Sequence, residues 1–440
     1  MRGATLCILI LVGWVYPPTD LFAETPTGLE SVGEYTHPTG TPAAATAPAT
    51  TQPIAFSAFH GGGGMLGVAP PIDPPPMRVR WTFSTRADEP ATAPATAPTT
   101  QPHRDGQAGA DSLTAAGLTT QPHHSGAAGV EGAPTIDGQS VYVADGGGAL
   151  HAIDLATGKE RWTYHSDDGF ETSPLVMNGR VYVGDLSGIF HAVSVADGKK
   201  LWTFDAENTI HSSANAVDGN IVFGTDGADI FCLDSEGRKI WQAKAGDRVN
   251  GAPAAAGGLV FVSGCDAQLR ALTVGAGEEK FAADIGALAP GSPAVLDDRI
   301  IIGTDQGRVV CMPRDGGKSI WEFDDIGEHA MVYGSPAVAD GIVIVGARDR
   351  NVHALDLANG KPLWSFPTRG DVDASPLISS GRVYVASRDK HLYVLDLKTG
   401  AQLWSFNAAR PISAGPVIGS GVLVIADTAG TVRCLEPAGK

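Results

Sequence analysis

The sequence has few charged residues, a deficit of positive charge and no long apolar run, and each shortage excludes a class of protein. Charged residues make up 18% of the 440 positions, below the level of about 25% in an average soluble domain. The 48 acidic and 31 basic residues leave a formal charge of −17. A nucleic-acid binder needs a basic footprint, so this class is excluded. No stretch of 18 apolar residues occurs, so no transmembrane helix is expected once a signal peptide is removed.

Cysteine is also scarce, and the five cysteines are isolated from one another. Cys232, Cys311 and Cys434 fall at one position of the repeat described below, where other units carry alanine. This pattern indicates small, buried and inert core thiols. Because 43% of the residues are hydrophobic, the core is large enough for an exported protein to fold without disulfides.

The residues that are present form two different parts, and the first is the N-terminal segment. A basic start, an apolar run at residues 6–12 and small residues near 23 are typical of a secretory signal peptide, which is predicted at 1–23. Residues 24–76 are rich in Pro, Thr, Ala and Gly and are predicted to be disordered, because they bury too little apolar surface to offset the entropy of ordering. A similar block at about 85–127 is predicted to be a disordered insertion.

The second part, from residue 130 onward, repeats itself at intervals of about 40 residues. An aromatic residue near the end of each unit recurs at spacings of 40, 39, 40, 40, 43 and 40. One unit is interpreted as four short strands separated by Gly- and Asn-containing turns. Four antiparallel strands in about 40 residues form one blade of a β-propeller, whereas a β-solenoid has shorter coils and parallel strands. The aromatic residues that are predicted to dock neighbouring blades are Trp81, Trp162, Trp202, Trp241, Phe281, Trp321, Trp364 and Trp404.

Seven complete units and a partial eighth predict eight blades. The last unit, 415–440, has only three strands, and the segment at about 77–84 matches the missing fourth strand, with Trp81 in the place of Trp404. This segment is predicted to complete the last blade, which removes the open edge of the ring. The expected fold is therefore an all-β, eight-bladed propeller that spans 77–440, with the insertion at about 85–127.

Several turns carry the pattern of a known family. The strings at 154–162, 356–364 and 396–404 place Asp, Gly and Trp at the same spacing. They resemble the tryptophan-docking repeats of the pyrroloquinoline-quinone (PQQ) type β-propeller superfamily, over residues of about 77–84 and 130–440. The superfamily includes quinoprotein dehydrogenases, which bind PQQ and calcium on the propeller axis. It also includes proteins similar to BamB, a noncatalytic subunit of the outer-membrane barrel assembly machinery.

The closer resemblance, to the BamB-like branch, implies an exported, noncatalytic scaffold that binds a protein partner. A monomeric propeller in the periplasm, at the outer-membrane periphery or outside the cell is expected, with no cofactor and no metal. No lipoprotein cysteine follows the apolar run, which departs from that branch and leaves membrane anchoring and the role in barrel assembly open. A third interpretation is an envelope sensor or polysaccharide-associated protein that uses the mouth of the axis.

The alternative is a small dehydrogenase of alcohols or sugars that depends on PQQ and calcium. The adjacent cysteine pair that the resemblance implies for the alcohol dehydrogenases is not present. Acidic residues do occur in three inter-blade loops, where solvated surface is the simpler interpretation. These residues are Asp167, Asp168, Glu171, Asp324, Asp325, Glu328, Asp371 and Asp373.

A cluster of basic residues distinguishes the last units from the rest of this acidic chain. The loop 347–350 is Ala-Arg-Asp-Arg and the loop 387–390 is Ser-Arg-Asp-Lys, where the first unit has Asp-Gly-Gly-Gly. In a propeller these loops and those that follow the outer strands emerge on the same face. The predicted partner-binding residues are Arg348, Arg350, Arg369, Arg388, Lys390 and Arg410. A solvated rim, balanced by nearby aspartates, is the competing interpretation.

Overall fold

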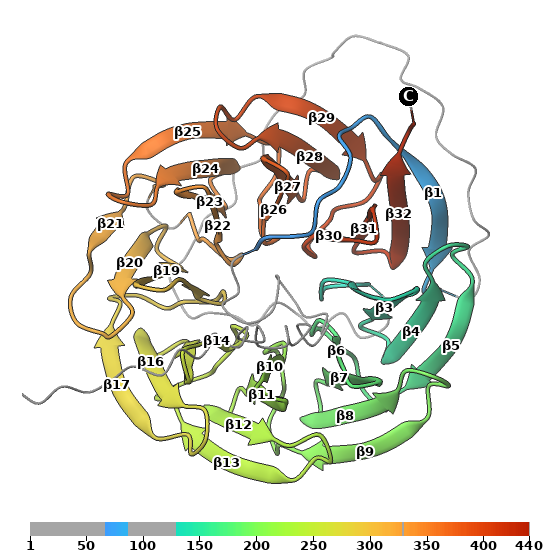
Figure 1. Ribbon diagram of the computed structural model, residues 1–440, viewed down its shortest axis with the longest axis horizontal. Coiled ribbons are helices and arrows are strands. Elements are labelled where there is room, and N and C mark those ends of the chain that lie inside the picture. The colour runs from blue at the N-terminus through green and yellow to red at the C-terminus, as the bar shows by residue number, and fades with distance from the viewer. Residues whose placement is uncertain (1–66, 87–128, 328–329, 440) are drawn as a thin grey trace, which may run out of the picture. The chain divides into compact units, whose positions relative to one another are not determined.

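The computed structural model describes residues 67–86, 129–327 and 330–439. These residues form eight four-stranded antiparallel sheets, which are arranged as blades around a central axis (Figure 1). The predicted eight-bladed propeller is confirmed. The predicted signal peptide and nearly all of the predicted insertion lie outside the described residues. Within the described ranges, no helix is long and apolar enough to cross a membrane.

Seven blades are continuous in sequence and run from the inner strand to the outer strand. Blade 1 contains β2 (Thr135–Asp137), β3 (Ser140–Ala144), β4 (Ala149–Asp154) and β5 (Glu160–His165), and blade 2 contains β6 (Leu175–Met177), β7 (Arg180–Gly184), β8 (Ile189–Ser194) and β9 (Lys200–Asp205). Blade 3 contains β10 (Asn215–Val217), β11 (Asn220–Gly224), β12 (Asp229–Leu233) and β13 (Lys239–Lys244), and blade 4 contains β14 (Ala254–Ala256), β15 (Leu259–Ser263), β16 (Gln268–Thr273) and β17 (Glu279–Asp284).

The remaining blades follow the same order. Blade 5 contains β18 (Ala294–Val295), β19 (Arg299–Gly303), β20 (Val309–Pro313) and β21 (Trp321–Phe323), and blade 6 contains β22 (Ala337–Ala339), β23 (Ile342–Gly346), β24 (Asn351–Asp356) and β25 (Pro362–Pro367). Blade 7 contains β26 (Leu377–Ser379), β27 (Arg382–Ala386), β28 (His391–Asp396) and β29 (Gln402–Asn407), and blade 8 contains β30 (Val417–Gly419), β31 (Val422–Ala426), β32 (Thr431–Pro437) and β1 (Met77–Ser84).

Blade 2 shows how the sequence produces these strands. The Asn178-Gly179 turn between β6 and β7 has φ values of +53° and +72°, which suit the tight turn of a two-residue hairpin. Four residues of β7 and four of β8 are buried, whereas each residue of the outer strand β9 is exposed or half-buried. Each sheet therefore buries both faces of its middle strands against the neighbouring blades, and the core is a series of layers between sheets.

A recurring contact docks each outer strand onto the following blade. The indole Nε1 of Trp162 donates a hydrogen bond of 2.9 Å to the carbonyl oxygen of Val195, and the ring lies against Gly198. Five other tryptophans make the corresponding bond to a carbonyl oxygen, at 2.7 to 3.0 Å. The pairs are Trp81 with Leu155, Trp202 with Ser235, Trp241 with Val274, Trp321 with Leu357 and Trp364 with Leu397. Phe281 packs on Gly316 without a donor. Trp404 faces blade 8. In this blade no turn joins the third strand, β32, to the fourth, β1, because the ring closes between them.

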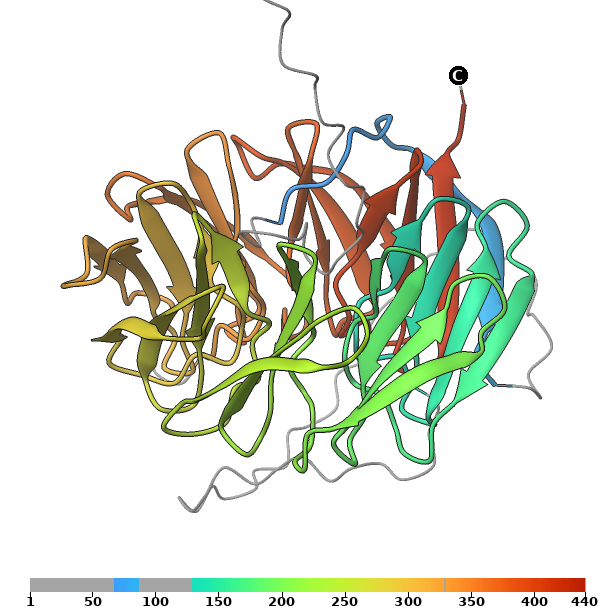
Figure 2. The same cartoon turned by 60° about the horizontal axis from the view of Figure 1, so that its bottom comes forward.

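The ring is closed by strands from both ends of the described chain. β1 pairs antiparallel with β32, in a register that runs from Met77 opposite Pro437 to Ser84 opposite Thr431. Figure 2 shows the blue β1 on the outside of the red C-terminal blade. The predicted closing strand is thus confirmed, with the predicted bounds.

The ordered chain begins earlier than the sequence predicted, because residues 67–76 are described although they belong to the segment expected to be disordered. Val68 forms a parallel bridge with Ile378 of the inner strand β26, through backbone bonds of 2.7 and 2.8 Å. Ile72 is 5% exposed and packs into the core between blades 7 and 8. The segment is ordered because strand pairing and one buried side chain offset the conformational entropy that is lost on ordering. The composition of the segment does not by itself provide this compensation.

Candidate functional site

One position in the loops between blades brings residues of several blades together at one end of the axis. This position precedes the first proline of a blade by three residues, as Glu131 precedes Pro134, except in blade 3, where Ala214 replaces the proline. Its residue differs in nearly every unit. The residues that occupy it are Glu131, Glu171, His211, Asn250, Pro290, Tyr333, Asp373 and Ser413. The members of this set share a place in the repeat but no chemistry, so the sequence did not reveal them as a site. Their constant place in the 40-residue repeat, three positions before the proline in seven units, is the signal that could have revealed them.

The charges of these residues act on one another across the ring. Glu131 precedes blade 1, yet it interacts electrostatically with Asp373 and Arg388 of blade 7 and with Glu171. Burial, followed by the negative charges of Glu171 and Asp373, raises the pKa of Glu131 above its usual value, against the opposing effects of Ser413 and Arg388. The position therefore forms an axial cluster, defined here as Glu131, Glu171, His211, Tyr333 and Asp373 with the arginines that contact them.

Asp373 holds two of the predicted arginines. Its carboxylate, 5% exposed, accepts a hydrogen bond of 2.8 Å from Nε of Arg348 and forms an ion pair with Arg388, whose Nε lies 2.9 Å away. The guanidinium of Arg348 also lies over the ring of Tyr333, 5.3 Å from its centroid, a cation–π arrangement. Asp373 therefore joins two guanidinium groups of blades 6 and 7 at the axial cluster.

A histidine bridges two carboxylates on the other side of the axial cluster. His211 Nε2 lies 3.3 Å from a carboxylate oxygen of Glu171, and Nδ1 lies 3.0 Å from one of Asp226. Burial alone would lower the pKa of His211, but its hydrogen bonds to Asp226 and Glu171 raise it to about 9. The imidazole is therefore a cation at neutral pH.

This histidine predicts a pH dependence of stability. Because the pKa of His211 is about 9 in the folded protein and about 6.5 in an unfolded chain, its contribution is complete below pH 6.5. It is lost as the pH rises to about 9. The contribution is at most of the order of 3 kcal/mol, at about 1.4 kcal/mol per pH unit. Urea unfolding between pH 6 and 9.5 is expected to show this loss, and the His211→Gln variant is expected to show a flatter profile.

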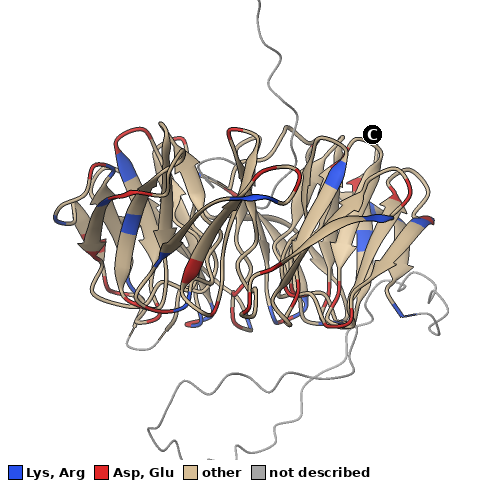
Figure 3. Ribbon diagram, turned by 90° about the horizontal axis from the view of Figure 1, so that it is seen from below, with Lys and Arg blue, Asp and Glu red and all other residues tan. Residues whose placement is uncertain are grey.

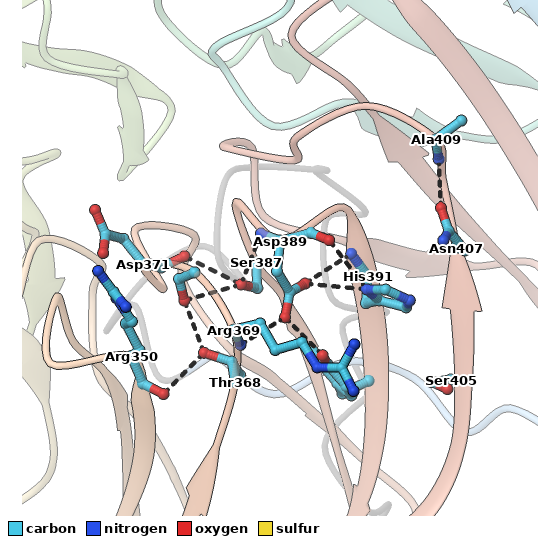
Figure 4. A network of polar contacts seen from close by, with 12 residues as sticks. Arg350, Thr368, Arg369, Asp371, Ser387, Asp389, His391, Ser405, Asn407 and Ala409 are labelled. Carbon is cyan, nitrogen blue, oxygen red and sulfur yellow. Dashed lines mark hydrogen bonds and ion pairs between the residues drawn. The ribbon is translucent and has the colours of Figure 1, made fainter. Parts of the chain in front are cut away.

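The six predicted partner-binding residues separate into two groups. Arg348 and Arg388 meet at Asp373, as described above. Arg350, Arg369, Lys390 and Arg410 are exposed, and in the described part of the chain none of their side chains is in an ion pair. These four residues are called the outer cations. Figure 3 shows that many charged residues occupy the loops at the two ends of the blades, and Figure 4 shows Arg350 and Arg369 near the ends of the strands of blades 6 and 7.

Local backbone contacts position the loops that carry the outer cations. The amide and hydroxyl of Thr368 donate to the carbonyl oxygen of Arg350, at 2.7 and 2.9 Å. The amide of Arg369 donates to Asp389 Oδ2 at 2.9 Å (Figure 4). The loop of blade 6 is thus fixed to that of blade 7 through the amide of Arg369 and the side chain of Asp389, and the cationic side chains are exposed.

The acidic loop residues also separate in the structure. Glu171 and Asp373 reach the axial cluster, where each is engaged by a cation. Asp371 interacts electrostatically with Arg348, whereas the side chain of Asp168 accepts a bond from the next residue of its own loop. Glu328 lies outside the described residues.

Comparisons with known proteins agree with this architecture. The family model described as "Outer membrane protein assembly factor BamB" matches residues 78–215, 186–325 and 314–440. No curated protein sequence matches the chain.

Solved structures share the fold at low sequence identity. BamB from Moraxella catarrhalis is 18% identical, with 70% of this chain and 84% of that chain covered and a TM-score of 0.53. A quinohemoprotein alcohol dehydrogenase from Comamonas testosteroni is 17% identical, with 71% and 75% covered and a TM-score of 0.60. The computationally designed Ika8 protein is 18% identical, with 70% and 97% covered and a TM-score of 0.62. The three family matches together span the propeller, and the chain therefore belongs to the family of the outer-membrane protein assembly factor BamB.

Proposed function

We propose that the protein is an exported, noncatalytic scaffold of the cell envelope that binds a protein partner through the outer cations, in outer-membrane protein assembly. The observation that carries this proposal is the use of Asp373. Its carboxylate is not available to a metal ion, because Arg348 and Arg388 hold it. The outer cations, in contrast, have no carboxylate partner in the described chain and lie exposed on a protein of charge −17. Such a local excess of positive charge favours an acidic partner surface.

The donor set of the axial cluster supports a noncatalytic role rather than a PQQ-dependent dehydrogenase. Calcium takes six to eight oxygen ligands, but Glu171 is shared with His211 and Asp373 with two arginines. Among the residues that the structure describes, no group of three His, Cys, Asp or Glu side chains is arranged to hold a metal ion. Two of the three carboxylates of the axial cluster are therefore already paired with cations, which favours the noncatalytic role over a calcium site.

The proposal predicts that reversing the charge of the outer cations abolishes partner binding. The Arg350→Glu, Arg410→Glu double variant is expected to reduce recovery of the partner at least tenfold after crosslinking and pull-down from the cell envelope. Barrel-assembly components are the expected partner. Arg348 and Arg388 are left unchanged, because reversing them would strand the buried carboxylate of Asp373. The Lys200→Glu, Lys239→Glu variant on blades 2 and 3 matches the charge change and is expected to keep the partner.

Two results would contradict the proposed function. Undiminished partner recovery with the outer-cation variant would exclude this docking surface. A bound quinone spectrum and dye-linked oxidation of an alcohol or sugar, after addition of PQQ and calcium, would establish the dehydrogenase instead.

A further inference from the structure

A groove lies beside the outer cations, between the outer strand β25 of blade 6 and the strands β28 and β29 of blade 7. It has a volume of about 370 Å³. Six of the residues that line it are Phe366, Arg369, His391, Tyr393, Gln402 and Ser405. Figure 4 shows Arg369, His391 and Ser405 around the end of these strands. The groove is separate from the axial cluster, because it opens on the outer rim and not at the inner strands.

Aromatic rings form the floor of this groove. The ring centroids of Phe366 and Tyr393 are 5.2 Å apart in an edge-to-face arrangement, and those of His391 and Tyr393 are 5.6 Å apart. Tyr393 is only 8% exposed, so its ring face is covered and offers no platform on which a sugar ring could stack. The floor instead supports the polar side chains that line the groove.

The carboxylate below the floor is already satisfied. Asp389 accepts hydrogen bonds from the hydroxyl of Tyr393 at 2.6 Å and from the backbone amides of Arg369 and His391, each at 2.9 Å. Burial would raise the pKa of Asp389, but these bonds lower it below its usual value. Asp389 also lies 3.3 Å from Nδ1 of His391, and it contacts Arg369 through the backbone amide and not through the guanidinium.

Arg369 is consequently the one charged side chain in the lining of the groove that has no carboxylate partner in the described residues. Its charge reaches the floor, since it acts electrostatically on the phenol of Tyr393. Gln402 and Ser405 add neutral polar groups to the lining, with Gln402 Nε2 donating to Ser405 Oγ at 3.4 Å. A guanidinium flanked by an amide and a hydroxyl is suited to a carboxylate, to which charge-assisted hydrogen bonds are about twice as strong as neutral ones.

The position that follows the outer strand by two residues differs between blades. It is Asp167 in blade 1, Glu207 in blade 2 and Ala409 in blade 7, where blade 6 has Arg369. Blade 8 also has a cation there, Arg86. An acidic ligand would be repelled at blades 1 and 2, and blade 6 combines the positive charge with the groove that Arg369 lines.

We propose that the groove binds the carboxylate side chain of a glutamate or aspartate in an extended acidic segment of the partner protein, with Arg369 as its counterion. This inference rests on the proposed function. The remaining outer cations, Arg350, Lys390 and Arg410, would attract the neighbouring acidic residues of the same segment. Charge complementarity identifies the occupant: the chain as a whole is strongly acidic, so a mobile acidic peptide finds an attractive potential only where cations cluster.

The test uses the full chain and two fluorescein-labelled synthetic peptides, Gly-Glu-Gly-Glu-Gly and Gly-Gln-Gly-Gln-Gly, followed by fluorescence anisotropy. The acidic peptide is expected to bind, with an affinity that falls as salt rises, and the glutamine peptide is not. Arg369→Gln is expected to weaken binding at least tenfold. Ser405→Trp fills the groove and is expected to do the same, whereas Lys200→Gln on blade 2 removes an exposed charge elsewhere and is expected to change the affinity less than twofold.

The Ser405→Trp variant is expected to fold, because the same outer-strand position holds Thr163, Gln242 and Glu322 in other blades. Equal binding of the two peptides, or unchanged binding of the acidic peptide to both groove variants, would overturn the inference. If the groove variants bind the peptide normally while Arg350→Glu, Arg410→Glu still loses the envelope partner, the proposed function stands and the groove is not its site. If that double variant keeps the partner, the proposed function fails independently.

Discussion

A chain that lacks residues 1–85 is expected to lose cooperative folding. β1 supplies the outer strand of blade 8, and its Trp81 is 8% exposed with its indole bonded at 2.8 Å to the carbonyl oxygen of Leu155. Removal exposes the edge of β32 and opens a core that contains Val141, Val424 and Cys434. Loss of one buried tryptophan alone costs about 3–5 kcal/mol, and total domain stability is about 5–15 kcal/mol. Calorimetry should therefore show no sharp transition.

The matched control is a chain that begins at residue 67, which keeps the strand and the bridge between Val68 and Ile378. It is expected to unfold at the same temperature as the full chain. The point variant Trp81→Ala should lie between the two, with a free energy of unfolding lowered by about 3–5 kcal/mol. If the chain that lacks residues 1–85 unfolded in the same transition as the full chain, closure by β1 would not stabilise the ring.

The Gly360→Ala variant is expected to lower the free energy of unfolding by about 3 kcal/mol. Gly360 has a φ of +71°, and an added Cβ would lie 2.5 Å from the ring of Trp321. A left-handed backbone costs a residue with a Cβ about 1–2 kcal/mol, and overpacking adds about 1–3 kcal/mol. The ring of Trp321 is also held by its bond to Leu357, so it cannot move away without loss of that contact.

Gly381→Ala separates the two causes. Gly381 has the same φ of +71°, but no atom lies within 4 Å of the added Cβ. This variant is expected to lose only the backbone contribution, about 1–2 kcal/mol. Urea unfolding of both variants measures the difference, which is the cost of the clash with the tryptophan. Equal losses in the two variants would mean that the docked indole does not require glycine in the turn.

The fold was predictable because its determinants are local and repeated. A two-residue turn such as Asn178-Gly179 defines a hairpin wherever it occurs, and the same pattern at 40-residue intervals identifies the blade. The docking contact is also local in its origin, because Trp162 and Gly198 each hold the same place in their units. The closing strand followed from the same arithmetic, since only residues near Trp81 matched the strand missing from the last unit.

The order of residues 67–76 was not predictable, because it arises from a contact with Ile378, some 300 positions away in the chain. Composition indicates how much apolar surface a segment carries, not whether another segment will cover it. One buried isoleucine, Ile72, three backbone bonds and a bond from the hydroxyl of Ser379 hold this segment.

The sequence by itself determined the number of blades, the closing strand and the sector in which the arginines gather. The tertiary structure alone decided what each charge contacts. Six basic residues looked alike in the sequence, yet the ring turns Arg348 and Arg388 onto Asp373 and leaves Arg369 beside a groove. The physical reason is that the periodicity of the sequence specifies which residues occupy equivalent places in the blades. Electrostatic and hydrogen-bond partners depend instead on the distances between blades, and these distances are set only when the ring closes.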